Sequence, residues 1–452
     1  MKTSITSDTL HRTAKFFMDV GHARTADDAL KTLEGFGLNI YVGDEAKTSI
    51  GHQIALLTLV NTARRTLLGG VRVIGDLDCS LLTHLGHGDS LGEAVRTLGG
   101  MSRDGSNDWP SAVIGTAGDT GKTGWQVTWQ GWRGGVIPLK DQHRLGEHGT
   151  VGAVFAAATC VAEVFFHFTG LHPMAGRRSS GMSLWSPGRD WLLEDPHEPE
   201  VEYLPSELWL IGLGNLGQAY LWVLASLPYM ATNDVFLILQ DIDELAESNE
   251  STSVLTSKAL LGQKKTRAMA AWLESRGFRT ALEERYFGES TRRQQNEPQV
   301  ALCGLDNALG RTWLEEAGFG LVVESGLGAG PEAFASFSLH TFPSELNAKH
   351  LWGSHSKPID VSRIQNMPAY TEAREAGMDA CGLAQMASRS IGVPFVGVMS
   401  ASLVIAELLR RLHSRQAYQV ISGSVLALSD LDVSPIQVGP YGFGYTNARP
   451  TD

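Results

Sequence analysis

A glycine-rich turn and an acidic residue stand in the second half of the chain in an order that suits nucleotide binding. Gly212, Gly214 and Gly217 follow an apolar run in "LWLIGLGNLGQAYLWVLASLP". Such a turn lets the backbone approach a phosphate, and the helix after it presents its positive N-terminal end. Asp241 ends the next apolar run, where a carboxylate can accept hydrogen bonds from ribose hydroxyls. Enzymes that bind NAD share these features.

The polar residues beyond Asp241 suit a polyphosphate and a metal ion. Asn249 can donate to phosphate oxygens, and Lys265, in "GQKK", offers a point charge. Asp306 comes directly after the apolar "VALCGL" and is a hard oxygen ligand of the kind that Mg²⁺ prefers on substrate phosphates. Each residue alone also suits an ordinary role as a helix cap, a solvated lysine or a turn aspartate. Their joint occurrence favours a triphosphate site, because an NAD site needs none of the three.

Alternating strands and helices are needed to bring these residues to one edge of a sheet. The second half follows the order strand, helix, strand, helix, strand through "ELWLIGLG", "LGQAYLWVLASLP", "DVFLILQDID", "GQKKTRAMAAWLESRGF" and "QVALCGLDN". The first half follows the same order from "GLNIYVGDE" to "SAVIGTAGDTGKTGW". This alternation predicts an α/β fold with mainly parallel sheets.

The two halves align as two copies of one unit. The corresponding positions are Gly43 and Gly212, Asp76 and Asp241, and Asp78 and Asp243. The late helical segments "VGAVFAAATCVAEVF" and "VGVMSASLVIAELL" also correspond. Four matches in one order predict a tandem of related, Rossmann-like units.

The first copy lacks the residues that suit a nucleotide. Of the three glycines it keeps only Gly43, and Glu45 stands where phosphates would approach. Ala117 takes the position of Asp306, and nothing matches the polar residues after Asp241. We therefore expect a nucleotide site in the second copy alone.

The chain is predicted to divide into two domains and a linker. Residues 1–170 form the degraded copy, the polar and proline-rich 171–207 the linker, and 208–452 the intact copy. The intact copy is longer, which predicts an insertion around 331–390 that contains Cys381.

Charge and hydropathy exclude several classes of partner. The formal net charge of −12 over 452 residues argues against binding to nucleic acid or to an anionic membrane. One apolar stretch, 150–168, approaches the length of a membrane span, but Glu163 and His167 interrupt it. We expect a buried core helix there.

The cysteines and the N-terminus indicate a cytoplasmic protein. The four cysteines are scattered without a C-x-x-C pair, which disfavours structural zinc and a disulfide framework. The first thirty or so residues contain no apolar segment of a secretory signal.

Beyond these inferences from the residues, the motifs resemble a known family. G-x-G-x-x-G, "DIDELAESN", "GQKK", "GLDNALGR" and the closing "GVPFVGVMSASLVIAELL", over about 208–415, resemble the adenylation domain of the ThiF/MoeB superfamily, the ubiquitin-activating type of enzyme. The tandem resembles the paired inactive and active adenylation domains of enzymes that activate ubiquitin-like modifiers. Among bacterial members, it is most similar to those encoded in antiviral operons for ubiquitin-like conjugation. Members adenylate the C-terminal carboxylate of a ubiquitin-fold protein with ATP and Mg²⁺, and many then capture it as a thioester.

The resemblance implies a role for each site residue. The glycine turn and Asp241 would hold the nucleotide, with Asp241 on the ribose and Asp243 as a second acid. Asn249 and Lys265 would hold phosphates, and Asp306 the metal.

The resemblance also implies two arginines, of which one is missing. The family has an arginine three positions after the asparagine, where this chain has Thr252, and Lys264 and Arg311 remain open as substitutes. The family also inserts an arginine from the partner domain's first helix. Arg12, in "LHRTAKFFMDVG", is the candidate, and it would neutralise charge on the triphosphate as pyrophosphate leaves.

Cys381 is the candidate thioester nucleophile. The other cysteines lie in an apolar strand or helix or in the degraded copy, whereas Cys381 combines a polar approach with a helix start, where the dipole favours the thiolate. Arg389 and Asp379 stand near it in sequence and could tune it. An inert cysteine packed under the last helices is the alternative.

The expected function is that of an activating enzyme. ATP and a ubiquitin-like protein would give an acyl-adenylate, then a thioester on Cys381, then transfer to a conjugating-type enzyme, by a monomer or homodimer. Adenylation without a thioester, an NAD-dependent oxidoreductase and a non-catalytic scaffold remain open alternatives.

Overall fold

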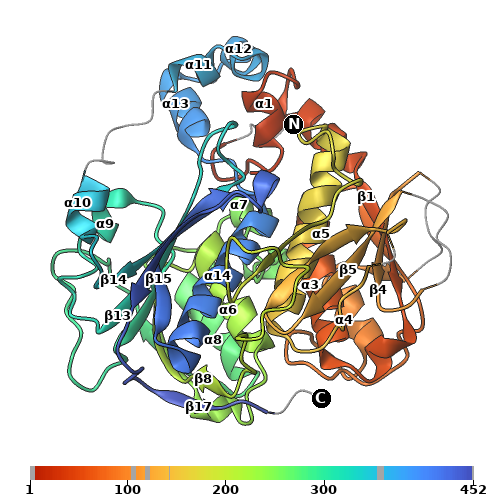
Figure 1. Cartoon of the computed structure of the whole chain (residues 1–452). Helices are drawn as coiled ribbons and strands as arrows, with labels where there is room; N and C mark the ends of the chain where they lie inside the picture. Colours follow the sequence, from red (N-terminus) through yellow and green to blue (C-terminus); the bar gives the residue numbers. More distant parts are fainter. Residues whose placement is uncertain (1–5, 103–107, 118–122, 142, 354–360, 450–452) are drawn as a thin grey trace.

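Two β-sheets with helices packed against them build the molecule (Figure 1). The structure is a computed structural model, and it describes residues 6–102, 108–117, 123–141, 143–353 and 361–449. Helices α3, α5, α6 and α14 lie in the centre, between the two sheets (Figure 1).

The first sheet comes from the first half of the chain. Within the described residues it has seven strands, in the order β3-β2-β1-β4-β5-β6-β7. The neighbours from β3 to β5 are parallel, and those from β5 to β7 are antiparallel. The strands are β1 Gly37–Val42, β2 Gly70–Ile74, β3 Met101–Ser102, β4 Ser111–Ile114, β5 Gly124–Gln130, β6 Arg133–Pro138 and β7 Ser180–Ser183.

The second sheet comes from the second half and repeats this order. In the part of the chain that the structure describes, it has eight strands, in the order β11-β10-β9-β12-β13-β14-β15-β16. It is parallel from β11 to β13 and antiparallel from there on. The strands are β9 Glu207–Ile211, β10 Phe236–Gln240, β11 Arg279–Glu283, β12 Val300–Cys303, β13 Leu321–Leu327, β14 Ser336–Phe342, β15 Gln416–Ser424 and β16 Asp432–Gln437; β8 Tyr203–Pro205 and β17 Tyr445–Asn447 pair separately.

The common strand order makes β1 to β7 the counterparts of β9 to β15, taken in sequence. In each half the first strand lies between the second and the fourth. The connections therefore run to opposite sides of this strand, and the point where they diverge is where open α/β sheets usually bind ligands. The predicted α/β fold with mainly parallel sheets is confirmed.

The helices follow the same duplication, with α3 matching α6 and α5 matching α14 by position in the strand order. The longer helices are α2 Ala26–Glu34, α3 Ile50–Thr66, α4 Leu91–Thr97, α5 Val151–Thr169, α6 Asn215–Ser226, α8 Lys265–Glu274, α12 Pro368–Glu375, α13 Ala380–Ser388 and α14 Pro394–His413. The shorter ones are α1 Lys15–Asp19, α7 Glu247–Glu250, α9 Ala308–Arg311, α10 Ala348–Gly353 and α11 Ser362–Gln365, with 3-10 turns at Asp44–Lys47, Thr232–Asp234, Lys258–Leu260 and Val425–Ala427.

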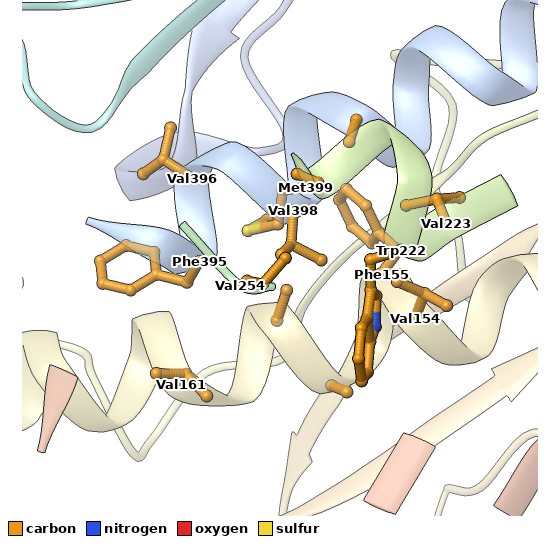
Figure 2. Close-up of a cluster of buried hydrophobic side chains, with 14 of the residues drawn as sticks. Val154, Phe155, Val161, Trp222, Val223, Val254, Phe395, Val396, Val398 and Met399 are labelled. Atoms are coloured by element: carbon orange, nitrogen blue, oxygen red, sulfur yellow. The ribbon is translucent and has the colours of Figure 1, made fainter. Parts of the chain in front are cut away.

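The two halves share one hydrophobic interior. Figure 2 shows Val161 of α5, Trp222 of α6 and Phe395 of α14 converging with their neighbours. Trp222 Nε1 also donates to Thr58 Oγ1 of α3 over 2.9 Å. By length and composition α5 could cross a membrane, but 89% of its most apolar window is buried inside the protein. The predicted core helix over 150–168 is therefore confirmed.

Two boundaries differ from the prediction. Residues 180–183, expected in the linker, form β7 of the first sheet, and 336–342, expected in the insertion, form β14 of the second. The sequence of β7, "SGMS", has none of the residues that favour strands, so local sequence did not predict it. Pairing with β6 makes this segment a strand. The additional helices of the second half, α10 to α13, begin after β14.

Helices α11 to α13 lie together at the top of the molecule, beside α1 (Figure 1). Tyr370 of α12 donates its hydroxyl proton to Asp19 of α1 over 2.5 Å, and Lys15 lies 2.5 Å from the same carboxylate. All three side chains are buried, so this network joins the additional helices to the first half.

Candidate functional site

A cavity of about 690 Å³ lies at the carboxyl ends of β9, β10 and β12. Strand pairing aligns Ile211 with Gln240 and with Cys303, so the residues that follow these three strands meet at one edge of the sheet. The predicted site residues that line the cavity are Arg12, Gly212, Gly214, Asp241, Asp243, Asn249, Lys265 and Asp306. Gly217 and Cys381 lie outside its lining.

The three glycines of the turn after β9 meet different requirements. Gly212 has φ +84°, a backbone conformation that residues other than glycine rarely adopt. A Cβ at Gly217 would lie 2.0 Å from the carbonyl oxygen of Gly212, so only glycine lets α6 approach the turn. A Cβ at Gly214 would meet nothing within 4 Å, which leaves the backbone there open to the cavity and to a phosphate.

Asp241 holds the turn through both of its carboxylate oxygens. Oδ2 accepts from the backbone N–H of Leu213 over 2.7 Å, and Oδ1 accepts from that of Asp243 over 2.8 Å. Asp243 is more open, with a side chain that is 65% exposed, and Lys265 Nζ contacts its Oδ2 at 2.8 Å. Of the two acids, Asp243 therefore offers the freer carboxylate to a ribose.

Asn249 faces the cavity with its amide group. Its Oδ1 accepts from the backbone N–H of Ala246 over 2.9 Å, which leaves the amide NH₂ to donate to an anion. The first half holds this segment from behind, because Arg65 of α3 donates to the carbonyls of Val254 and Thr256 over 3.1 and 2.9 Å.

Asp306 presents an exposed carboxylate on the turn after β12. The turn is fixed by Arg311, whose Nε donates to the carbonyl of Leu305 over 2.8 Å and whose Nη1 lies 3.2 Å from Glu324. The described residues contain no cluster of three or more metal-binding side chains. An exposed carboxylate of this kind is a hard oxygen ligand and fits a Mg²⁺ ion held on substrate phosphates.

Arg12 reaches the cavity from the first half of the chain. The resemblance implied a place in the first helix, but Arg12 lies in the turns just before α1. Its backbone N–H donates to Ser251 Oγ over 3.1 Å. Burial lowers the pKa of the Arg12 guanidinium to about 10, an effect that Asp306 and Asp8 oppose. Its Nε is buried, with no hydrogen-bond partner among the described residues.

Both suggested substitutes for the arginine missing at Thr252 already have partners within the protein. Lys264 Nζ donates to the carbonyl of Ile242 over 2.8 Å and does not line the cavity. Arg311 lines it but is bound to Glu324 and to carbonyl oxygens. Both suggestions stay predictions, with Arg311 placed in the cavity lining and Lys264 outside it.

Cys381 stands exposed in the first turn of α13. Asp379 caps this helix by accepting from the backbone N–H of Gly382 over 2.7 Å. Arg389, expected to tune the thiol, lies just past the opposite end of α13 and lines the cavity instead.

The other three cysteines are poor nucleophiles. Burial raises the pKa of the Cys303 thiol to about 12 and raises that of Cys160 further. Burial and the nearby Asp76 also raise the pKa of Cys79. The position and exposure of Cys381 therefore distinguish it from the rest.

The matching place in the first half is filled by its own side chains. A Cβ at Gly43 would lie 2.2 Å from Glu45 Oε2, so this carboxylate covers the first-half turn, whereas the turn of the second half is open at Gly214. The backbone N–H of Thr116 donates to Glu45 Oε1 over 3.0 Å. Burial opposes the shift, yet these hydrogen bonds leave the pKa of Glu45 below its usual value. Lys47 lies 2.8 Å from Asp76, the counterpart of Asp241.

Sequence reasoning did not anticipate Asp8 or the rim residues Arg285, Tyr286 and Phe287 as part of the cavity. Asp8 lies far from the motifs in sequence. The rim residues directly follow β11, and their place after a parallel strand is the one signal that could have found them.

Comparison with known proteins gives two matching family models. The model of the BilD N-terminal domain matches residues 37–184, and that of the BilD C-terminal domain matches residues 204–415. A curated protein from Collimonas sp. (strain OK412), named bacterial E1-like protein BilD, is 50% identical over 458 aligned positions, covering 100% of this chain and 98% of the relative.

Solved structures give weaker matches. E. coli MccB with succinimide has a TM-score of 0.33 and 11% identity, covering 52% of this chain and 64% of MccB. E. coli MccB with ATP has a TM-score of 0.31 and 12% identity, with the same coverage. This chain thus matches under two thirds of MccB, and likeness at this level carries no argument about activity. The full-length identity to the Collimonas protein is decisive: the chain belongs to the BilD family.

Proposed function

We propose that this protein activates the C-terminus of a ubiquitin-like protein with ATP and Mg²⁺, captures it as a thioester on Cys381 and passes it to a conjugating-type enzyme. The observation that carries the proposal is the convergence of the glycine turn, Asp243, Asn249, Lys265 and Asp306 on one cavity. The name of the Collimonas relative, a bacterial E1-like protein, supports it.

The cavity residues suit the first step, adenylation. A carboxylate oxygen of the modifier bonds to the α-phosphorus of ATP, the bond from that phosphorus to the bridging oxygen breaks, and pyrophosphate leaves with the electron pair. The open backbone at Gly214 and the amide of Asn249 face the phosphates as donors, and Lys265 and Arg12 add positive charge. A Mg²⁺ ion on Asp306 would neutralise part of the charge on the phosphates.

The second step is attack on the adenylate. The thiolate of Cys381 bonds to the acyl carbon, and AMP leaves with the electrons of the broken carbon–oxygen bond. Cys381 lies outside the cavity lining, so this step requires α13 and the bound adenylate to approach each other.

The same observation favours one alternative, in which the protein adenylates its substrate without forming a thioester. The two functions share the cavity and differ only in the use of Cys381.

Exchange of labelled pyrophosphate into ATP, dependent on a ubiquitin-like protein, tests adenylation. We expect exchange by the unaltered protein and at least a roughly 100-fold loss in Asp306→Ala, since a lost charge-stabilising contact in a closed site costs about that much. Exchange that is unchanged in Asp306→Ala would refute the metal assignment, and no exchange by the unaltered protein would refute adenylation.

A non-reducing gel tests the thioester. Cys381→Ala should retain exchange but lose a thiol-sensitive adduct, and Cys79→Ala, the matched control, should keep both. An adduct that survives in Cys381→Ala rejects the assigned cysteine, and exchange without any adduct in the unaltered protein favours the alternative.

A further inference from the structure

Most positive side chains around the cavity are already bound to carboxylates. Lys265 is held by Asp243, Arg285 by Glu283 at 2.7 Å, and Arg311 by Glu324 at 3.2 Å. Among the described lining residues, Arg12 has no carboxylate within ion-pair distance, and Arg389 pairs with Asp8, which is itself exposed. A triphosphate carries several negative charges, and these two side chains can meet them in addition to Lys265.

The backbone beside Arg389 is held at the cavity wall. Ile391 donates its backbone N–H to the carbonyl of Ala329 over 3.0 Å, and Thr13 Oγ1 donates to the carbonyl of Gly392 over 3.0 Å. The guanidinium contacts Asp8 at 2.9 Å, in a pair whose side chains are 46% and 67% exposed. An exposed pair of this kind is weak, so a bound anion can displace Asp8.

Arg12 and Arg389 lie close enough to repel each other. The positive charge of Arg389 adds to the effect of burial in lowering the pKa of Arg12. An anion bound between two like charges relieves their repulsion, and a polyphosphate can take that place.

Thr252 stands on the same stretch of wall. Its side chain is buried at 7% exposure, and a Cβ at Gly392 would lie 2.5 Å from its Cγ2 and 3.3 Å from the Cβ of Arg12. Arg389, three residues before Gly392, therefore reaches the cavity beside the position where an arginine is missing.

We propose that Arg389, together with Arg12, binds the triphosphate of ATP, supplying from the end of α13 the positive charge that residue 252 does not provide. This inference rests on the proposed adenylation. It names a substrate-binding residue that comes from the additional helices and not from the glycine-turn motifs.

Calorimetric titration of the full chain with a non-hydrolysable ATP analogue and Mg²⁺, and separately with AMP, tests the proposal. Arg389→Ala should weaken the analogue by roughly 10- to 100-fold, the usual worth of a hydrogen bond to a charged group, and leave AMP binding unchanged. Arg389→Lys should retain part of the affinity, because it keeps the charge and loses the planar fork. Arg363→Ala, which breaks an exposed pair with Glu332 outside the cavity, is the matched control and should bind as the unaltered protein does.

A second pair of variants addresses the contact with Asp8. Asp8→Asn should strengthen binding of the analogue by releasing Arg389, and this gain should vanish when Arg389 is also replaced by Ala. A gain in affinity for the analogue that persists in the double variant contradicts the proposal. So does an Arg389→Ala variant that loses affinity for the analogue and for AMP equally, or for neither. If the unaltered protein binds neither ligand, the proposed function itself fails.

Discussion

At the scale of single residues, the turn after β9 separates the requirements of folding from those of binding. Gly217 is needed because α6 approaches the carbonyl of Gly212, whereas Gly214 is needed because a ligand would approach it. Asp241 shows the same division, since its carboxylate is occupied by backbone N–H groups and Asp243 is left for a ligand.

Two glycine variants should separate these requirements. Gly217→Ala should lower the free energy of unfolding by about 1–3 kcal/mol through overpacking against Gly212. Gly214→Val should leave that free energy unchanged and lower the affinity for ATP by roughly 10- to 100-fold, because the valine side chain would occupy the open space. Urea unfolding and calorimetric titration measure the two effects. The opposite pattern, with Gly214→Val unfolded and Gly217→Ala intact, would contradict the assignment.

At the scale of elements, the first half serves the site although it has none of its own. Helix α3 holds residues 250–256 through Arg65, and Asn61 Nδ2 donates to the carbonyl of Val254 over 3.0 Å. The first half's own turn, at Gly43, is covered by Glu45. The degraded copy thus supports the 250–256 segment of the intact copy.

Arg65→Ala should therefore reduce both stability and binding. It leaves the carbonyl of Thr256 without its donor and that of Val254 with Asn61 alone, at about 1–3 kcal/mol for the unpaired buried group, and it loosens the segment that carries Asn249. Arg64→Ala is the matched control, since Arg64 makes only a 3.9 Å contact with Glu250 and should cost less than about 1 kcal/mol. Urea unfolding and ATP titration measure both; equal effects of the two variants would contradict a specific role for Arg65.

At the scale of the whole molecule, the two halves pack against each other around a shared interior. The interior between the sheets is built by α5 from one half and by α6 and α14 from the other (Figure 2). Phe395 lies 5.7 Å from Phe165 and 6.0 Å from Phe166, measured between ring centroids, so aromatic contacts cross the boundary.

Phe395→Ala should destabilise both halves together. The cavity it leaves should lower the free energy of unfolding by about 3–5 kcal/mol. Leu193 is 66% exposed, so the control Leu193→Ala should change this free energy by less than about 0.5 kcal/mol. Far-ultraviolet circular dichroism and tryptophan fluorescence in urea should report one coincident transition. Two separate transitions would show that the halves unfold independently.

Much of this organisation follows from the sequence alone. Apolar runs that alternate with helical segments predict mainly parallel sheets, and turn residues such as Gly212 and Asp306 follow strands that end at the same edge. The duplication and the absence of site residues in the first half are likewise visible in sequence, because each depends on local patterns repeated at matching positions.

Tertiary structure alone decided the partners of these residues. It directed Asp241 to the Leu213 N–H and Arg311 to Glu324, and it brought Asp8 and Arg389 to one cavity from opposite ends of the chain. It also made strands of 180–183 and 336–342, where sheet pairing outweighs weak local preference. Local patterns specify elements and their ends, whereas contacts between residues hundreds of positions apart depend on how the two halves pack.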